Sequence, residues 1–439
     1  MADENDFVDR YSLAINDLTR ISDPARKIVM LAAECITGPD HLIHLQTGIP
    51  ELKEKEIRGL IDPVGSNDPD IIAILEKAMT PHIMDEFGSS GIVYDLSAIR
   101  YYGSYNELAQ YGHYYHMNGG NREINFVLAV TRKHGIPVHH RPMSGNIPSV
   151  PTISAFSKEL VDYGIVTILI VMDRGFYSAD SMKDLKDYSI IGALPSSLTI
   201  HDDLIHGSAG IEDSRNYLQC GNEIVFHREE RIRGTRYMIY FSPRLRSQRL
   251  ESFYAQLSER EATLSDLMGR RFRSQRDRIA TVESALKGFR NLMDVQYSDN
   301  GFTYELKHKA VQRKTSRFGY TILFTNTQFP AGFILKTYRE KDVVEKAFSH
   351  VKPHLEPFFS RSERGTRARL FLTILGYTMA AIIAARCSIP HERVMKTISG
   401  IREVVYIPTN HIPMWNTRRS RGNCWRNSRL NCSDKAGRR

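Results

Sequence analysis

The chain has 439 residues, a formal net charge of +9 and a pI near 9.2. This length exceeds one average domain, so we expect two or three packed units and exclude a small disulfide-stapled scaffold. Five cysteines without a C-x-x-C pair argue against a disulfide framework or a zinc cluster, and favour a reducing cytoplasm. The cationic excess suits a polyanion such as DNA, and it equally suits a basic soluble protein that binds no nucleic acid.

Residues 1–90 are predicted to be helical, because apolar residues recur at helical spacing in IVMLAAECI and IIAILEKAM. The N-terminus, MADENDFVDR, is acidic and has no apolar core, so no secretory signal is expected. Gly88-Ser-Ser-Gly91 interrupts the helical pattern and indicates a domain boundary.

Alternating strand and helix patterns follow over residues 91–197. Short β-rich runs occupy 92–99, 124–131 and 136–143, and the helical pattern TISAFSKELVDYG comes next. VTILIVMD at 166–173 is almost wholly apolar, as expected of a strand buried on both faces. Ser178 is a candidate cap for a helix over SADSMKDLKDY, and SIIGALP is read as a strand. The alternation predicts an α/β layer architecture.

Residues 198–317 are expected to form an insertion domain. The strand-like stretches NEIVFHREE, RYMIYFSP and YELKHKAVQ flank a highly charged helical segment from about residue 249 to 293. FGYTILFTN at 318–326 then resumes the buried-strand texture, so a second part of the core is placed at 318–405. Within it, the apolar run 370–385 is shorter than the roughly 20 residues a span needs and is bracketed by two arginines, which favours a buried core helix over a membrane helix.

The tail, residues 406–439, differs in composition from the rest of the chain. It holds both tryptophans, and its basic residues are almost exclusively arginine. A disordered basic arm and a reading-frame change that replaced the original C-terminus are both open, and we favour the frame change. Reading the gene in the other frames past codon 409 tests this, because an amphipathic continuation is then expected.

The segment YREKDVVEKAFSHVKPHL, at 338–355, has the pattern of an amphipathic helix. On one continuous helix, a polar stripe within roughly 60° is formed by Tyr338, Lys341, Glu345 and Lys352. A neighbouring apolar stripe, which would seat the helix on a core, is formed by Val344, Phe348, Val351 and Leu355. An ordinary surface helix with i,i+4 ion pairs gives the same pattern.

Two aspartates lie in apolar strand patterns upstream of this helix. Asp95 is inside VYDLSAI, and Asp173 ends ILIVMD immediately before Arg174 and Gly175. A carboxylate in an apolar strand is costly unless it is paired or bound to a metal, so each aspartate needs a partner. A structurally satisfied aspartate remains an alternative at either position, although a strand's carboxyl end is where α/β sheets collect ligands.

Taken together, the three motifs resemble the DDE transposases of prokaryotic insertion sequences, the group with a Y-x2-R-x3-E-x6-K signature and an insertion domain before the Glu. Tyr338, Glu345 and Lys352 match that signature, and Lys341 takes the Arg position, which keeps the charge but loses the bidentate fork. Asp173-Arg-Gly-Phe176 resembles the second-Asp motif and Tyr94-Asp95 the first. Gly145-Asn146 resembles a recurrent turn of the family, and the resemblance covers about residues 90–400.

The resemblance implies an RNase H-like (retroviral integrase-like) α/β fold, in which a mixed sheet carries two Asp on adjacent strands and a later helix delivers the Glu. It implies that Asp95, Asp173 and Glu345 are catalytic and hold two Mg²⁺ or Mn²⁺ ions. Phosphate contacts with DNA are implied for the neighbouring basic and phenolic residues, Tyr338, Lys341, Lys352 and Arg174. The expected partners are double-stranded DNA, as terminal inverted repeats and target DNA, and a second copy of the chain in a homodimer on DNA.

Other functions stay open beside this one. A transposase remnant that only binds DNA would keep the fold and the basic surface, and a repair nuclease on the same fold would lack the helix at 338–355. The histidines His113, His116, His139 and His140 fit no strong zinc pattern and are equally well explained as loop and strand residues. We expect the protein in a prokaryotic cytoplasm, on the nucleoid when bound to DNA, and not in a membrane.

Overall fold

The computed structural model describes residues 23–37, 53–68, 70–112, 120–147, 150–165, 169–177, 185–298 and 301–398. All of them belong to the first of two compact units, Met1–Ile398. Several predicted features lie outside the described residues: the helix cap at Ser178, the histidines His113 and His116, and the tail from residue 406.

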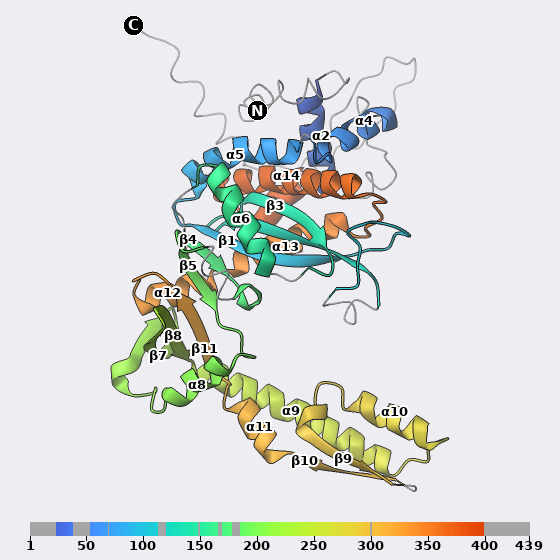
Figure 1. Ribbon diagram of the computed structural model, residues 1–439, viewed down its shortest axis with the longest axis vertical. Coiled ribbons are helices and arrows are strands. Elements are labelled where there is room, and N and C mark those ends of the chain that lie inside the picture. The colour runs from blue at the N-terminus through green and yellow to red at the C-terminus, as the bar shows by residue number, and fades with distance from the viewer. Residues whose placement is uncertain are drawn as a thin grey trace, which may run out of the picture. The chain divides into compact units, whose positions relative to one another are not determined.

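A nine-stranded mixed sheet is the centre of the fold (Figure 1). Its strand order is β3-β2-β1-β4-β5-β11-β8-β7-β6, in which β1 is parallel to β4 and β4 is parallel to β5, while all other neighbours are antiparallel. In chain order the strands are β1 (Ile92–Arg100), β2 (Glu123–Thr131), β3 (Pro137–Ser144), β4 (Leu169–Met172), β5 (Ser189–Ala193), β6 (Tyr217–Cys220), β7 (Glu223–Ile232), β8 (Thr235–Phe241) and β11 (Tyr320–Thr325). A separate hairpin is formed by β9 (Met293–Tyr297) and β10 (Phe302–Leu306).

Helices pack against the sheet and also form the parts of the chain that lie outside it. They are α2 (Pro24–Thr37), α4 (Glu54–Val64), α5 (Ile71–Phe87), α6 (Val150–Asp162), α8 (Thr199–Gly207), α9 (Pro243–Met268), α10 (Gln275–Ala285), α11 (His308–Thr315), α12 (Ala331–Arg339), α13 (Asp342–Leu355), α14 (Glu363–Cys387) and α15 (His391–Ile398). Short 3-10 turns, η1 (Arg174–Phe176), η2 (Ser214–Asn216) and η3 (Arg290–Leu292), precede or follow strands. The expected mixed α/β architecture is therefore confirmed.

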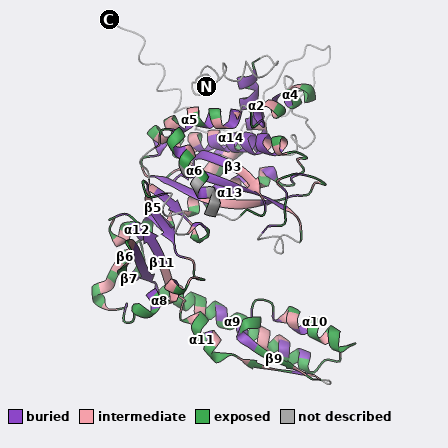
Figure 2. Ribbon diagram, in the orientation of Figure 1, coloured by how far each residue is buried: buried purple, intermediate pink, exposed green. Residues whose placement is uncertain are grey.

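The central strands are apolar and buried, as their sequences predict (Figure 2). All nine residues of β2 are buried, and β4, which ends the run VTILIVMD, is hydrogen-bonded on both sides by parallel strands. Strands buried on two faces need continuous apolar sequence rather than alternation, which is what these runs supply. The strands expected at 92–99, 124–131, 136–143 and 318–326 correspond to β1, β2, β3 and β11.

Successive residues of β1 point to opposite faces of the sheet. Tyr94 stacks on Phe156 of α6, with ring centroids 4.3 Å apart, so α6 covers the Tyr94 face. Asp95 lies on the other face. It is paired with Leu128, two residues from Phe126, whose ring meets Phe348 of α13 at 5.2 Å. The carboxylate of Asp95 is therefore on the face that α13 covers.

Helix α14 contains the apolar run 370–385 and packs against α2, α4, α13 and β3. Its contact with α2 is close: a Cβ on Gly376 would lie 2.2 Å from the carbonyl oxygen of Ala32. Among the described residues α14 is the one helix long and apolar enough to cross a membrane, and 61% of that apolar window is buried inside the protein. We therefore interpret α14 as the core helix that the sequence predicts.

The segment 198–317 divides into two parts. Strands β6, β7 and β8 extend the nine-stranded sheet through β8 and β11, whereas α9, α10, β9, β10 and α11 enclose a hydrophobic cluster of their own. Two expectations for this segment are wrong. The charged helix does not run unbroken to 293, because it ends before Gly269 and restarts at Gln275. YELKHKAVQ is not one strand, because β10 ends at Leu306 and α11 begins at His308.

The turn after β3 explains the Gly145-Asn146 motif. A Cβ at Gly145 would lie 2.1 Å from the carbonyl oxygen of Glu123, so only glycine permits this approach of two backbones. Asn125 fixes the same turn from β2, because its side-chain amide donates to the carbonyl oxygens of Gly145 and Ile147, at 3.0 and 3.3 Å. The motif therefore closes the β2-β3 edge of the sheet.

Candidate active site

The pairing of β1 with β4 brings the two predicted aspartates side by side. The parallel register aligns Val93 with Val171 and Tyr94 with Met172. One residue further along each strand are Asp95 and Asp173, so the two carboxylates occupy neighbouring positions at the carboxyl end of β4. The charge of Asp173 accordingly contributes to the electrostatics of Asp95.

Glu345 comes from α13, which packs on β1 and β2. The continuous helix expected over 338–355 is wrong: α12 ends at Arg339 and α13 begins at Asp342. Hydrogen bonds of the i to i+3 type bridge the break, from Lys341 N to Tyr338 O at 3.1 Å and from Val344 N to Lys341 O at 3.1 Å. Tyr338, Lys341 and Glu345 still converge on one place, because Tyr338 and Lys341 both contact Asp173 and Lys341 also contacts Glu345.

A salt bridge to a distant residue holds the turn between the two helices. Glu340, in the turn between the two helices, forms a salt bridge with Arg132 at 2.5 Å, and Arg132 follows β2. The turn is therefore held against the sheet by a residue that is far away in sequence.

The ammonium group of Lys341 joins two of the three predicted acids. Its Nζ lies 2.8 Å from Oε1 of Glu345 and 3.6 Å from Oδ2 of Asp173. Burial alone would lower the pKa of Lys341, but the hydrogen bond to Glu345 and the charge of Asp173 outweigh burial and raise it. The side chain is therefore an ammonium ion at neutral pH, and it acts as a counter-ion to the carboxylates.

Asp95 is the most buried of the three acids. Burial raises its pKa to about 6, and the charges of Asp173 and Glu345 act in the same direction. The backbone N–H of Leu96, which donates to Oδ1 at 2.8 Å, and the charge of Lys341 oppose the rise. Burial, rather than the neighbouring acids, therefore makes the largest contribution to the raised pKa of Asp95.

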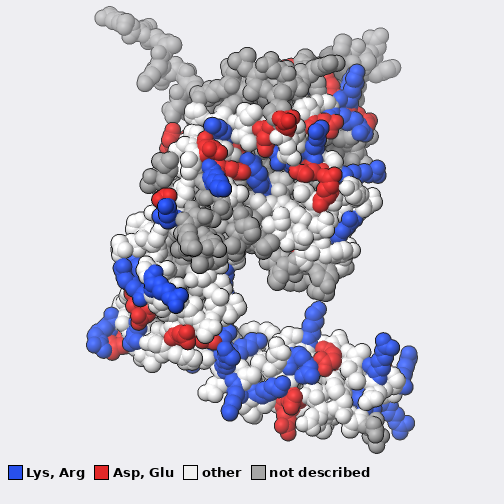
Figure 3. All heavy atoms as spheres, viewed as in Figure 1, with Lys and Arg blue, Asp and Glu red and all other residues white. Residues whose placement is uncertain are grey.

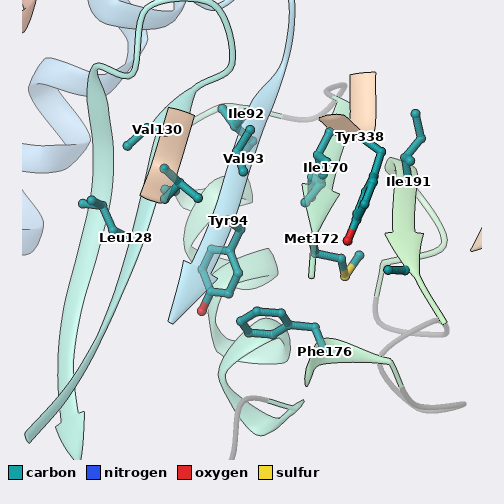
Figure 4. Packing of buried hydrophobic residues seen from close by; sticks show 14 of the residues in the cluster. Ile92, Val93, Tyr94, Leu128, Val130, Ile170, Met172, Phe176, Ile191 and Tyr338 are labelled. Atoms are coloured by element: carbon teal, nitrogen blue, oxygen red, sulfur yellow. The ribbon is translucent and has the colours of Figure 1, made fainter. Parts of the chain in front are cut away.

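Tyr338 contacts the carboxylate of Asp173. Its hydroxyl donates to Oδ1 of Asp173 at 3.0 Å, and its ring lies beside β4 near Met172 (Figure 4). Burial, together with the negative charge of Asp173, raises the pKa of the phenol. Beneath the site, Tyr94 and Phe176 pack edge to face at 5.2 Å, so the loop after Asp173 rests on the core.

Lys352 and Arg174 complete the predicted set. Lys352 is half-buried, two turns along α13 from Glu345, and burial lowers its pKa against the opposing charges of Glu356, Asp95 and Glu123. Arg174 is exposed, and its charge acts on the Tyr338 phenol. The structure thus brings together all seven residues singled out from the sequence, while the role of each remains a prediction.

Sequence reasoning missed three charged neighbours of this site. Glu123 and Glu356 act on Lys352, and Arg249 of α9 lies close enough to Arg174 for the two charges to interact. Glu123 begins β2, and Arg249 lies in the segment that was assigned to the insertion. No local motif marks these residues, because only the pairing of β1 with β2 and the placement of α9 bring them here.

The donor set fits a divalent cation by its chemistry. Three carboxylates supply hard oxygen ligands, which Mg²⁺ and Mn²⁺ prefer, and a cation would stabilise the carboxylate form of Asp95, whose pKa burial raises. In the conformation described, no group of three or more His, Cys, Asp or Glu among the described residues is arranged to hold a metal ion. In this conformation the ammonium group of Lys341 lies between the carboxylates of Asp173 and Glu345.

The histidine pair of β3 belongs to a separate buried cluster. The Nδ1 atoms of His139 and His140 lie 3.3 and 2.5 Å from the Glu76 carboxylate, which also accepts hydrogen bonds from Arg141 and from the hydroxyl of Tyr163, both at 2.9 Å. Burial alone would raise the pKa of Glu76, but the charges of the two histidines and Arg141 hold it well below its usual range. This cluster joins α5 and α6 to the edge of the sheet.

Comparison with known proteins identifies no family. No family profile matches the sequence, and no curated protein matches it. Among solved structures, one similar chain is a piggyBac transposase in a synaptic complex with hairpin DNA. It aligns at 9% sequence identity with a TM-score of 0.37, over 85% of this chain and 69% of that chain. A similarity this loose assigns neither residues nor an activity.

Proposed function

We propose that the protein is a DDE-type transposase, which cleaves DNA strands at the ends of an insertion sequence and joins them to target DNA with a divalent cation. One observation carries the proposal. The parallel register of β1 and β4 puts Asp95 beside Asp173. Glu345 of α13 lies at the same place, because the ammonium group of Lys341 contacts both Glu345 and Asp173. Two acids on adjacent strands and a third on a later helix are also what an RNase H-like core requires.

Asp95, Asp173 and Glu345 would hold Mg²⁺ or Mn²⁺, and two ions are expected. When bound, such ions supply Lewis-acid stabilisation of the phosphoryl oxygens and lower the pKa of a water or of a DNA 3′-hydroxyl. The protein's own contribution is placement. Tyr338 fixes the orientation of the Asp173 carboxylate, and the backbone N–H of Leu96 fixes that of Asp95.

The basic residues around the carboxylates would bind the phosphates that flank the scissile bond. Lys341 and Lys352 lie on the Glu345 side, and Arg174 lies on the Asp173 side. Among the described residues neither Lys352 nor Arg174 has a hydrogen bond or ion pair to a side chain. Both cations are therefore available to phosphate oxygens, which arginine can bind in a bidentate way.

A DNA-binding remnant without catalysis is the second candidate. The observation that favours it is the position of Lys341, whose ammonium takes the place between Asp173 and Glu345 that a metal ion would need. In an active enzyme this side chain has to turn away when the cation and the DNA phosphate bind. Double-stranded DNA is the partner in both candidates, and a homodimer on DNA and a cytoplasmic location complete the proposal.

The test is Mg²⁺-dependent cleavage of a duplex that carries the DNA bordering the gene, including any inverted repeats. We expect wild-type protein to nick this duplex and Asp173→Ala to lose more than about a hundredfold in rate, since even second-shell changes at metal sites cost 10- to 100-fold. Asp342→Asn is the matched control, because Asp342 is exposed on α13, the helix of Glu345, and its one ion pair among the described residues is with Lys346. Cleavage that survives in Asp173→Ala would refute the mechanism, and binding without cleavage by wild type would favour the remnant.

A further inference from the structure

The turn that joins α9 to α10 carries a cluster of arginines. Residues 269–278 read GRRFRSQRDR, with five arginines, one aspartate and no lysine. Four of the arginine side chains are exposed, and we call this set the arginine turn: Arg270, Arg271, Arg273 and Arg276. Figure 3 shows Lys and Arg outnumbering Asp and Glu on the viewed face of the α9–α11 segment.

The arginine turn lacks the counter-charges that other arginines have. In the part of the chain that the structure describes, none of its four side chains forms a hydrogen bond or a salt bridge with an acidic group. Other exposed arginines do: Arg58 meets Glu54 at 2.8 Å, and Arg386 meets Glu86 at 2.7 Å. Four like charges held close together repel one another, so an anionic partner gains the energy of relieving that repulsion.

The backbone that presents these arginines is held in place. The hydroxyl of Ser274 caps α10 by accepting from Asp277 N at 3.1 Å, and Arg273 N donates to the Asp277 carboxylate at 3.2 Å. The fifth arginine, Arg278, donates to the carbonyl oxygens of Ser298 and Gly301, which ties the turn to β9 and β10. A preformed surface loses little conformational entropy on binding.

The two ends of α9 are far apart along its axis. From Arg249, in its second turn, to its last residue, Met268, α9 rises by 19 residues, which is about 29 Å at 1.5 Å of rise per residue. The first turns hold Arg249, whose pKa is lowered by burial and by the charge of Arg174 beside Asp173. The other end leads into the arginine turn. This length is close to one turn of B-DNA, roughly 34 Å or about 10 base pairs.

We propose that the arginine turn binds the phosphate backbone of duplex DNA about one helical turn away from the phosphodiester in the candidate active site. The partner is duplex DNA rather than a protein, because all four cations are guanidinium groups. Their planar forks match phosphate oxygens, and the one aromatic side chain among them, Phe272, packs against the hydrophobic cluster of the α9–α11 segment, with the Arg270 guanidinium over its ring. The contact carries no base specificity. The proposal rests on the proposed function for the position of the scissile bond.

The experiment measures the salt dependence of DNA binding by the full-length chain. The probe is a duplex of about three helical turns and arbitrary sequence, in EDTA, followed by fluorescence anisotropy between about 50 and 200 mM salt. The test variant changes Arg270, Arg271, Arg273 and Arg276 to Gln. The control variant removes the same charge from α4 and α15, at the exposed residues Lys55, Arg58, Arg393 and Lys396.

Each lost phosphate contact reduces the slope of log K against log salt by about 0.9. We expect the slope of the arginine-turn variant to fall by about three to four and that of the control to change by less than one. Equal slopes in all three proteins, or equal falls in both variants, would overturn the proposal. Should the fourfold variant melt earlier than wild type, Arg271→Gln alone is expected to reduce the slope by about one, and an unchanged slope there overturns it equally.

Footprinting on a cleavable duplex gives the position. We expect wild type to protect the backbone about 10 base pairs from the cut, and the arginine-turn variant to lose that protection while it keeps protection at the cut. Protection that stays the same in the variant contradicts the proposal. Because the binding measurement needs no catalysis, a chain that shows the slope difference but never cleaves refutes the proposed function alone, and a chain that cleaves without the slope difference refutes this proposal alone.

Discussion

Replacing Lys341 by Met is expected to tighten the binding of a divalent cation. The ammonium of Lys341 lies 2.8 Å from Oε1 of Glu345. An ion bonded to that oxygen at about 2.1 Å lies no farther than about 5 Å from the ammonium. At this distance, a doubly charged ion and an ammonium repel by about 1.7 kcal/mol, even at the dielectric constant of water.

This repulsion corresponds to a little over tenfold in affinity. The figure is a lower bound, because the Lys341 side chain is only 18% exposed and screening there is weaker than in bulk water. Removing the ammonium also leaves Asp173 and Glu345 without their shared counter-ion, which favours a cation further. The Mn²⁺ dissociation constant of Lys341→Met should thus fall at least about tenfold.

The assay is a titration of the full-length protein with Mn²⁺, followed by the electron paramagnetic resonance signal of the free ion. Lys346→Met is the matched control, since Lys346 lies on the same helix, pairs with Asp342 at 2.9 Å and removes the same charge. We expect its affinity for Mn²⁺ to match that of wild type. Unchanged or weaker binding in Lys341→Met would refute the view that this ammonium occupies a cation site.

Further predictions concern the site, the buried cluster and the core. Tyr338→Phe removes only the hydroxyl that donates to Asp173, so we expect single-turnover cleavage to slow by about ten- to a hundredfold, as for loss of a hydrogen bond to a charged group, with the melting temperature nearly unchanged. Glu76→Ala should lower the free energy of unfolding by about 3–5 kcal/mol, because it leaves the buried partner Arg141 without its main acceptor; a loss below about 1 kcal/mol in urea unfolding would contradict this. The free energy of unfolding of the wild type should decrease as the pH is lowered, in two steps. The first decrease begins below pH 6.5, the unfolded-state pKa of histidine, because burial lowers the pKa of His140 in the folded state. The second begins below pH 4.5, the unfolded-state pKa of glutamate, because the pKa of Glu76 is held low in the folded state. Urea unfolding from pH 7.5 to 4 checks this, and stability that rises on acidification would oppose it. Gly376→Ala should cost about 1–3 kcal/mol through its clash with Ala32, and a neutral result would show that α2 does not pack there.

The elements of the core were predictable from local sequence, but their partners were not. The strands around Asp95 and Asp173 follow from apolar runs, whereas their adjacency depends on β1 pairing with β4, whose partner residues are 78 positions apart (Ile92 with Ile170). The joining of β6, β7 and β8 to the same sheet through β11 is likewise a non-local pairing that no turn signal announces. Periodicity therefore predicted the parts of the sheet and missed its extent.

The helix at 338–355 illustrates a different limit. Its apolar positions have unbroken helical spacing, and no Gly or Pro marks the interruption at Glu340 and Lys341. The break accompanies the salt bridge of Glu340 with Arg132, whose position in the sequence gives no hint of the contact. The histidines of β3 show the same effect, because their acidic partner Glu76 lies on α5.

Whether the three carboxylates act as one cation site can be measured without any knowledge of the DNA sequence. Mn²⁺ titration of Asp95→Asn, Asp173→Asn and Glu345→Gln should show each variant binding at least about tenfold more weakly than wild type, with Asp342→Asn unchanged. Mn²⁺ affinity that is the same in wild type and in all three variants would contradict the proposed site, and with it the proposed transposase.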